Sequence, residues 1–198
     1  QIKDYVAGDD YRTINWQATA RRNRLMVNVY HDERSQQVIS VIDKGRVMQQ
    51  AFNGITLLDY AINAALIISY VAVRKDDRAG LLTFHKQTDT FIAAEKHQGH
   101  MRRLLEGLYA QQTDFCESDF SALCTGVNRF IRRRSLLILY TNFSGVNSML
   151  RQLPYLQQLN LIVSQLRQAG IHTLLTTPDN LSINLINKYL DMKARGLF

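Results

Sequence analysis

Apolar and polar positions alternate along the chain in blocks that predict strands and helices in turn. Residues 37–42, 78–84 and 135–140 are apolar runs bounded by polar residues, a pattern typical of buried parallel strands. Residues 57–74 carry apolar side chains at helical spacing nearly all round. They predict a buried helix, for which Thr56 is a suitable N-cap.

Weaker patterns fill the intervals between these elements. The other expected strands are residues 25–30, 88–93 and 170–176. The other expected helices are residues 99–108, 118–132 with Ser118 as cap, 147–159 continuing to 168, and 181–194. This alternation predicts an α/β fold with a doubly wound, mostly parallel sheet, helices on both faces and one antiparallel edge strand.

The domain organisation follows from the same patterns. Residues 1–35 are polar and irregular, and we expect them to pack on a domain formed by residues 36–198. The helix predicted over 147–159 continues to 168 without the strand that an α/β alternation requires between them. Either the fold lacks a strand there or a strand-bearing segment near residue 160 is missing from the sequence, and we expect the second.

Composition limits the possible functions and surroundings. A net charge of +7 favours a polyanionic neighbour, but no base-reading motif is present, so nucleic acid is not the expected partner. Cys116 and Cys124 would lie about 12 Å apart along a helix, too far for a disulfide, which indicates a reducing compartment. The longest apolar stretch, residues 61–73, falls short of the ~20 residues of a membrane span. The chain has no initiator Met, so we expect it to be a fragment of a longer protein.

Candidate binding residues lie where the predicted strands end. Ligands of open α/β sheets bind beyond the carboxyl ends of the strands. The candidates there are Asp43, Gly45 and Val47 after one strand, Asn142 after another, and Ser118 and Asp119 at a helix start.

Five of these residues resemble the metal-ion-dependent adhesion site of von Willebrand factor A domains, a pattern of Asp-x-Ser-x-Ser, a later Thr and an Asp after a central strand. The resemblance implies Mg²⁺ as a ligand, because the cation prefers oxygen donors. Asp43 matches the first Asp, and Ser118 could replace the Thr. Gly45 and Val47 stand in place of the serines, and Asn142 in place of the second Asp. We therefore expect a degenerate site with little affinity for a divalent cation.

The neighbouring charges lead to the same expectation. Lys44 and Arg46 beside Asp43 oppose a bound cation. We expect Asp43 to cap a neighbouring loop or to pair with Arg46. Lys44, Arg46 and Asp119 are then candidates for an interaction surface with a protein.

Residues 4–22 read Asp-Tyr-Val-Ala-Gly-Asp-Asp-Tyr-Arg-Thr-Ile-Asn-Trp-Gln-Ala-Thr-Ala-Arg-Arg. This segment resembles the signature of the bacterial "domain of unknown function 58" family, with mild departures at Asp4 and Ala7. Further matches are residues 24–27, 57–61, 77–82 and 189–196. The signature residues of interest are Gly8, Asp9, Asp10, Arg12, Trp16, Arg21 and Arg22.

This resemblance implies a von Willebrand A-like domain on the cytoplasmic face of the inner membrane, anchored by helices that precede it in other members. Members are often encoded beside MoxR-type AAA+ ATPases and are thought to act as their partners. We therefore expect a non-catalytic adaptor without a cofactor.

The signature segment has a physical interpretation of its own. We expect Trp16 to be an apolar anchor, and Asp9 and Asp10 to accept bonds from backbone N–H groups or to pair with the signature arginines. The arginines are expected to tie the segment to the sheet rather than to form a docking surface.

Alternative functions come from other classes. A Mg²⁺-dependent hydrolase would need Asp43, Asp119 and Asp114 to converge within about 5 Å. A basic module for nucleic acid or anionic lipid would use the arginine clusters. Glu95, His97 and His100 lie close in sequence, but one helical turn without a further close ligand is a weak metal signal.

Overall fold

The computed structural model describes residues 2–28, 35–97, 99–113, 115–164 and 177–196. The chain divides into two compact units, Gln1–Arg34 and Ser35–Phe198. The strand expected over residues 170–176 lies outside the described residues.

The first unit is built around a short antiparallel pair of strands. β1 (Ile2–Asp4) pairs with β2 (Met26–Asn28), which lies within the strand expected over 25–30, and residues 29 and 30 lie outside the described residues. Between them lie the 3-10 helix η1 (Tyr11–Thr13) and the helix α1 (Trp16–Arg22).

The second unit contains a four-stranded sheet in the order β7-β6-β3-β8. Its strands are β3 (Gln37–Asp43), β6 (Arg78–Phe84), β7 (Thr88–Glu95) and β8 (Ser135–Tyr140). β3 is parallel to both β6 and β8, and β7 is antiparallel to β6 at the edge of the sheet. These observations confirm a mixed α/β fold with a mostly parallel sheet.

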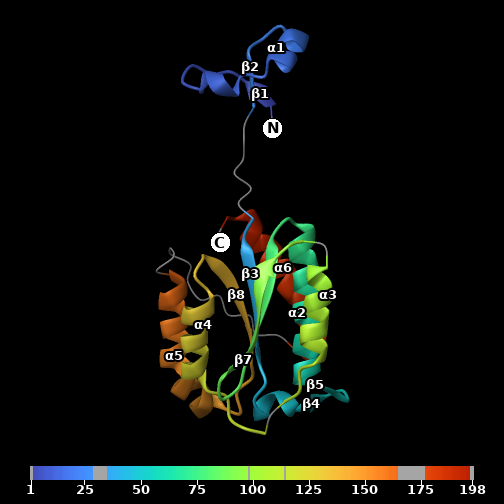
Figure 1. Ribbon diagram of the computed structural model, residues 1–198, viewed down its shortest axis with the longest axis vertical. Helices are drawn as coiled ribbons and strands as arrows, with labels where there is room; N and C mark the ends of the chain where they lie inside the picture. Colours follow the sequence, from blue (N-terminus) through green and yellow to red (C-terminus); the bar gives the residue numbers. More distant parts are fainter. Residues whose placement is uncertain (1, 29–34, 98, 114, 165–176, 197–198) are drawn as a thin grey trace. The chain divides into compact units, whose positions relative to one another are not determined.

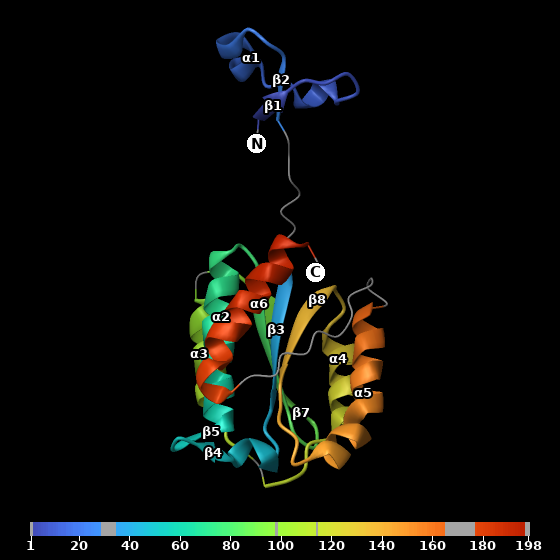
Figure 2. The ribbon, with the colours of Figure 1, turned by 180° about the vertical axis from the view of Figure 1, so that it is seen from behind.

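Helices cover both faces of this sheet (Figures 1 and 2). One face carries α2 (Leu57–Arg74), α3 (His100–Tyr109) and α6 (Leu181–Ala194). The other face carries α4 (Phe120–Phe130) and α5 (Val146–Ser164). The short elements are η2 (Arg46–Gln49), β4 (Ala51–Phe52), β5 (Ile55–Thr56) and η3 (Pro178–Asn180).

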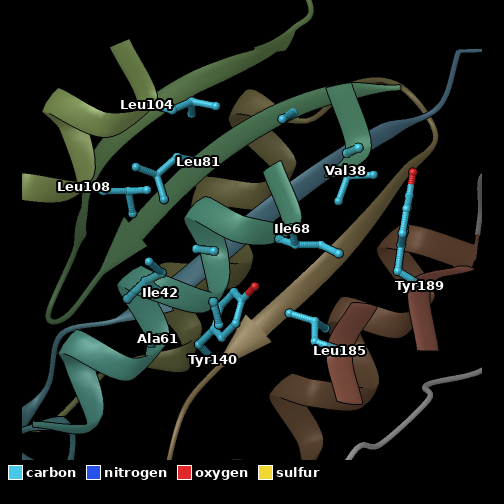
Figure 3. Packing of buried hydrophobic residues seen from close by; sticks show 14 of the residues in the cluster. Val38, Ile42, Ala61, Ile68, Leu81, Leu104, Leu108, Tyr140, Leu185 and Tyr189 are labelled. Carbon is cyan, nitrogen blue, oxygen red and sulfur yellow. The ribbon is translucent and has the colours of Figure 1, made fainter. Parts of the chain in front are cut away.

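The period-two alternation of β3 divides the core between the two faces. Val38 and Ile42 belong to the apolar cluster under α2, α3 and α6, whereas Ile39 and Val41 belong to the cluster under α4 and α5. Figure 3 shows the first cluster, in which Ile68 of α2 lies among side chains from the sheet and from α6.

The central helix α2 has a buried face made largely of alanine. Ala61, Ala64, Ala65 and Ala72 are buried beside the sheet. With 18 residues, α2 is the one described helix long and apolar enough to span a membrane. The apolar stretch 61–73 lies within this helix, and the expectation that it is not a membrane span stays a prediction. A buried core helix meets the same criteria.

Helix α5 forms without a break at residue 160. It runs from Val146 to Ser164, so the residues on both sides of position 160 belong to one helix. Tyr155, Leu156 and Leu159 pack against the cluster beneath α4. A strand-bearing segment missing near residue 160 stays a prediction.

The C-terminal helix is fastened to the sheet through Asp77, which precedes β6. The hydroxyl of Tyr189 donates to Asp77 Oδ2, and Lys193 Nζ donates to the same oxygen at 2.7 Å. The backbone N–H of Gln36 donates to Asp77 Oδ1 at 3.1 Å. Two separate sequence matches of the signature family, residues 77–82 and 189–196, therefore meet in one buried contact.

Candidate functional site: a closed carboxylate at the strand ends

Asp43 is the last residue of the central strand β3, and only 1% of it is exposed. Its Oδ1 accepts hydrogen bonds from the backbone N–H of Gly45 at 2.8 Å and from the hydroxyl of Ser118. Its Oδ2 accepts a bond from the hydroxyl of Thr141 at 2.7 Å. Neutral donors of the protein itself therefore satisfy both carboxylate oxygens.

Strand register explains why Thr141 reaches Asp43. β3 and β8 are parallel, and Ile42 pairs with Tyr140. The next residue of each strand therefore lies at the same edge, which brings the Thr141 hydroxyl beside the carboxylate. Thr141 was not among the residues predicted from the sequence. The signal was present as a hydroxyl directly after the apolar run, but its use needed the register.

Close contact with Ser118 leaves no room for a side chain at Gly45. A Cβ atom built on Gly45 would lie 1.9 Å from Ser118 Oγ and 3.1 Å from Asp43 Oδ1. A serine at position 45, as in the adhesion-site pattern, would therefore collide with the hydroxyl that now bonds Asp43. Ser118 occupies the space that such a side chain would require.

The prediction that Ser118 caps the following helix is wrong. Helix α4 begins at Phe120, and its N-cap is Asp119, whose Oδ1 accepts bonds from the backbone N–H groups of Ser121 at 2.8 Å and Ala122 at 3.2 Å. The hydroxyl of Ser118 donates to Asp43 instead, and the observed N-cap is one residue later than predicted. Asp119 therefore has a clear local role at the exposed start of the helix.

Burial raises the pKa of Asp43 above its ordinary value, because desolvation disfavours the charged form. The bonds from Ser118, Thr141 and Gly45 oppose that shift without cancelling it. The alternative in which Asp43 caps the adjacent turn agrees with the bond from Gly45 N–H.

The neighbouring cations bond to other carboxylates. Arg46 Nη2 lies 3.4 Å from Glu117 Oε1, and both side chains are exposed. Lys44 is buried, and its Nζ lies 2.5 Å from Asp89 Oδ2. Contrary to our prediction, Lys44 therefore does not present its ammonium group on an exposed surface.

Asn142 and Val47 line the same open pocket as Asp43 without bonding it. The side-chain amide of Asn142 donates to Gln50 Oε1 at 3.1 Å, and its oxygen accepts from the backbone N–H of Phe143. Val47 is partly buried against the main core. The pocket is lined by Asp43, Arg46, Val47, Glu117, Ser118, Phe120, Asn142, Phe143, Ser144, Ser148 and Gln152.

Among the described residues, no group of three metal-ligand side chains forms around Asp43. Such a group is found at Glu95, His97 and His100, at the other end of the sheet, because Glu95 pairs with Ala79 near the start of β6. Asp114, which the hydrolase alternative requires, lies outside the described residues.

The acidic residues of the N-terminal signature organise the backbone of their own unit. Asp9, which follows Gly8, accepts bonds from Val6 N–H at 3.0 Å and Lys3 Nζ at 2.9 Å. Its pKa is lowered, first by the bond from Lys3. Asp10 caps η1 through the N–H of Arg12 at 3.0 Å.

Trp16 and the signature arginines are exposed within that unit. Trp16 is 70% exposed, so the first unit does not bury it. Arg21 and Arg22 lie in the last turn of α1, where cations interact favourably with the helix dipole. Within the described part of the chain, Arg12, Arg21 and Arg22 form no ion pair with a carboxylate.

The fold and this site define a mixed α/β domain in which a buried carboxylate at the strand ends is closed by hydroxyl and backbone donors. The family described as protein of unknown function DUF58 matches residues 1–167, and the chain belongs to that family. No curated protein matches the chain.

Proposed function

We propose that this chain is a non-catalytic interaction domain of the von Willebrand factor A type that binds a protein partner at the carboxyl ends of its strands. The partner is a MoxR-type AAA+ ATPase, and the complete protein holds the domain at the cytoplasmic face of the inner membrane. The net charge of +7 suits a domain kept near an anionic leaflet.

The closed state of Asp43 is the observation that carries this proposal. In an adhesion site, a metal ion completes its coordination with a carboxylate from the partner. Here three donors already occupy the oxygens of Asp43, and Ser118 fills the space beside Gly45. Partner binding at this edge would therefore use direct side-chain contacts rather than a shared cation.

Exposed aromatic and apolar side chains near the strand ends supply such contacts. Tyr109, at the end of α3, is 90% exposed, and Phe115, in the loop that leads to Ser118, is 81% exposed. Ile55 of β5 and Val146 at the start of α5 are also exposed. Aromatic side chains are enriched at protein interfaces, and charged pairs such as Arg46 with Glu117 are typical of the rim.

Copurification of the chain with the ATPase, with Arg46→Glu as the test variant, examines this proposal. We expect Arg46→Glu to weaken association at least about tenfold, because the new negative charge at the rim would face partner groups that complement the positive charge of Arg46. Arg102→Glu makes the same charge change on exposed α3, where Arg102 pairs with Glu106, and should leave association within about twofold. Equal loss in both variants, or no association in any nucleotide state, would overturn the proposal.

Magnesium titration followed by calorimetry tests the closed carboxylate directly. We expect no binding heat from Mg²⁺ at Asp43, because its oxygens are already bonded. Low-micromolar Mg²⁺ binding that disappears in Asp43→Asn would contradict the proposal and favour a functional cation site.

A further inference from the structure

Glu95, His97 and His100 form a compact cluster where the antiparallel strand β7 leads into α3. One ligand atom from each residue lies within 4.8 Å of the other two. His97 Nε2 is 2.8 Å from Glu95 Oε2, and His100 Nδ1 is 3.7 Å from the same oxygen. Since β7 runs opposite to β3, the cluster lies at the other end of the sheet from Asp43.

Two backbone features of the described residues help to position His100 near His97. Gly99 has a φ of 89°, a left-handed conformation that suits glycine. The backbone N–H of His100 donates to the carbonyl of His97 at 3.2 Å. The ring centroids of His97 and His100 lie 5.6 Å apart, and both rings approach Glu95 Oε2.

His100 supplies the observation that distinguishes this cluster from a surface ion pair. Only 1% of His100 is exposed, and its Nε2 lies 2.7 Å from the backbone carbonyl of Ala79. A carbonyl only accepts, so Nε2 carries a proton, and in the neutral form of imidazole the lone pair is then on Nδ1. Among the described residues, that buried Nδ1 has no hydrogen-bond partner, and it lies 3.7 Å from Glu95 Oε2.

This arrangement is the one that a metal-binding histidine requires. Metal-ligating histidines almost always donate their second ring N–H to a carbonyl, a carboxylate or water, which fixes the tautomer. Ligand atoms around tetrahedral zinc lie about 3.4 Å apart, given bonds of about 2.0–2.1 Å. The separations of 2.8 and 3.7 Å from Glu95 bracket that value, so small side-chain adjustments complete the geometry.

We propose that Glu95, His97 and His100 bind a zinc ion, with Nδ1 of His100 as the buried ligand. Three protein ligands leave a fourth position for water or for a ligand from another molecule. The site joins the end of the edge strand β7 to the start of α3. Arg103 Nη1, 3.7 Å from Glu95 Oε2, is the cation that zinc would displace from this carboxylate.

Calorimetric titration of the chelator-treated chain with ZnCl₂ tests the proposal. We expect binding near one equivalent, with affinity falling at least about tenfold in His97→Gln and in Glu95→Gln, since each removes one of three ligands. Both side chains are substantially exposed, so these variants should keep the fold.

Two neighbouring arginines give a matched pair with opposite expectations. Arg103→Gln should raise the zinc affinity severalfold because it removes the competing cation, whereas Arg102→Gln, whose partner is Glu106, should leave it unchanged. Equal zinc binding by the native chain, His97→Gln and Glu95→Gln would overturn the proposal. The absence of binding by the native chain would do so as well.

Discussion

Asp43 and Asp77 are both buried aspartates beside adjacent parallel strands, but their partners differ in charge. Asp43 ends β3 and accepts bonds only from neutral donors, namely Gly45 N–H, Ser118 and Thr141. Asp77 precedes β6 and is bonded by the ammonium group of Lys193 as well as by Tyr189.

Because of this difference, we expect Asp77 to contribute mainly to stability, by holding α6 to the sheet, and Asp43 to contribute less. Removing either member of a buried carboxylate–cation pair is strongly destabilising, because the remaining charge would be uncompensated. A buried carboxylate with neutral donors retains its desolvation cost, and the raised pKa of Asp43 reflects that cost. Substitutions at the two positions should therefore differ in size and in pH dependence.

The largest effect is expected at Asp77. Asp77→Ala should lower the free energy of unfolding by about 3 kcal/mol, because it removes the buried carboxylate that accepts from both Lys193 Nζ and the Tyr189 hydroxyl. Urea denaturation measures the change. Asp76→Asn is the control, since Asp76 is exposed, pairs only loosely with Lys96, and has a φ of 63° that Asn tolerates. Equal losses of stability in Asp77→Ala and Asp76→Asn would contradict the proposed role of the buried Asp77 contacts.

A smaller effect is expected at Gly45. Gly45→Ala should cost about 2 kcal/mol, because its Cβ would lie 1.9 Å from Ser118 Oγ. Gly145→Ala places a methyl group in open space near the same edge and should change stability by less than about 0.5 kcal/mol. Adding Ser118→Ala to Gly45→Ala should recover part of the loss. Strictly additive effects in this double-mutant cycle would argue against the packing of Ser118 on Gly45.

The smallest effect on stability is expected for Asp43→Asn. An amide can accept from Gly45 N–H and Ser118 and donate to Thr141, so stability near neutral pH should stay within about 1 kcal/mol or rise. The pKa of Asp43 is raised in the folded state, so the folded chain binds more protons than the unfolded chain just above the ordinary value of 3.8. The free energy of unfolding contributed by this group therefore falls as pH rises through that window.

Removal of the carboxyl group should abolish that contribution. The stability of Asp43→Asn relative to the native chain should thus increase as pH rises from about 4, which thermal unfolding across a pH series measures. Asp119→Asn, at the exposed cap of α4, controls for the loss of a nearby carboxylate while keeping a good N-cap residue. A pH-independent difference for Asp43→Asn would contradict the burial argument.

Local signals in the sequence predicted the elements of the fold well. The apolar runs 37–42, 78–84 and 135–140 became the three parallel strands. Thr56 caps α2 as expected, by accepting a bond from the N–H of Asp59 at 3.1 Å. These features depend on spacing and on the chemistry of neighbouring residues, which the sequence displays directly.

The site depended on contacts that spacing alone does not reveal. The structure brings Asp43, Gly45 and Ser118 together, but the position of Thr141 required the register of two strands far apart in sequence. Ser118 looked like a helix cap because nothing local showed that Asp43 would recruit its hydroxyl. Likewise, the burial of Lys44 depends on Asp89 of β7, a residue 45 positions away.

The contact between Asp77 and Tyr189 joins residues separated by 112 positions. During synthesis on the ribosome, β3, β6 and β8 all emerge before the tyrosine that secures Asp77. Until then Asp77 lacks its bonds from Tyr189 and Lys193. The apolar face of the sheet that α6 covers in the folded domain is also still exposed. Apolar surface that stays exposed during synthesis promotes aggregation, so substitutions that weaken the docking of α6 should lower the yield of folded chain.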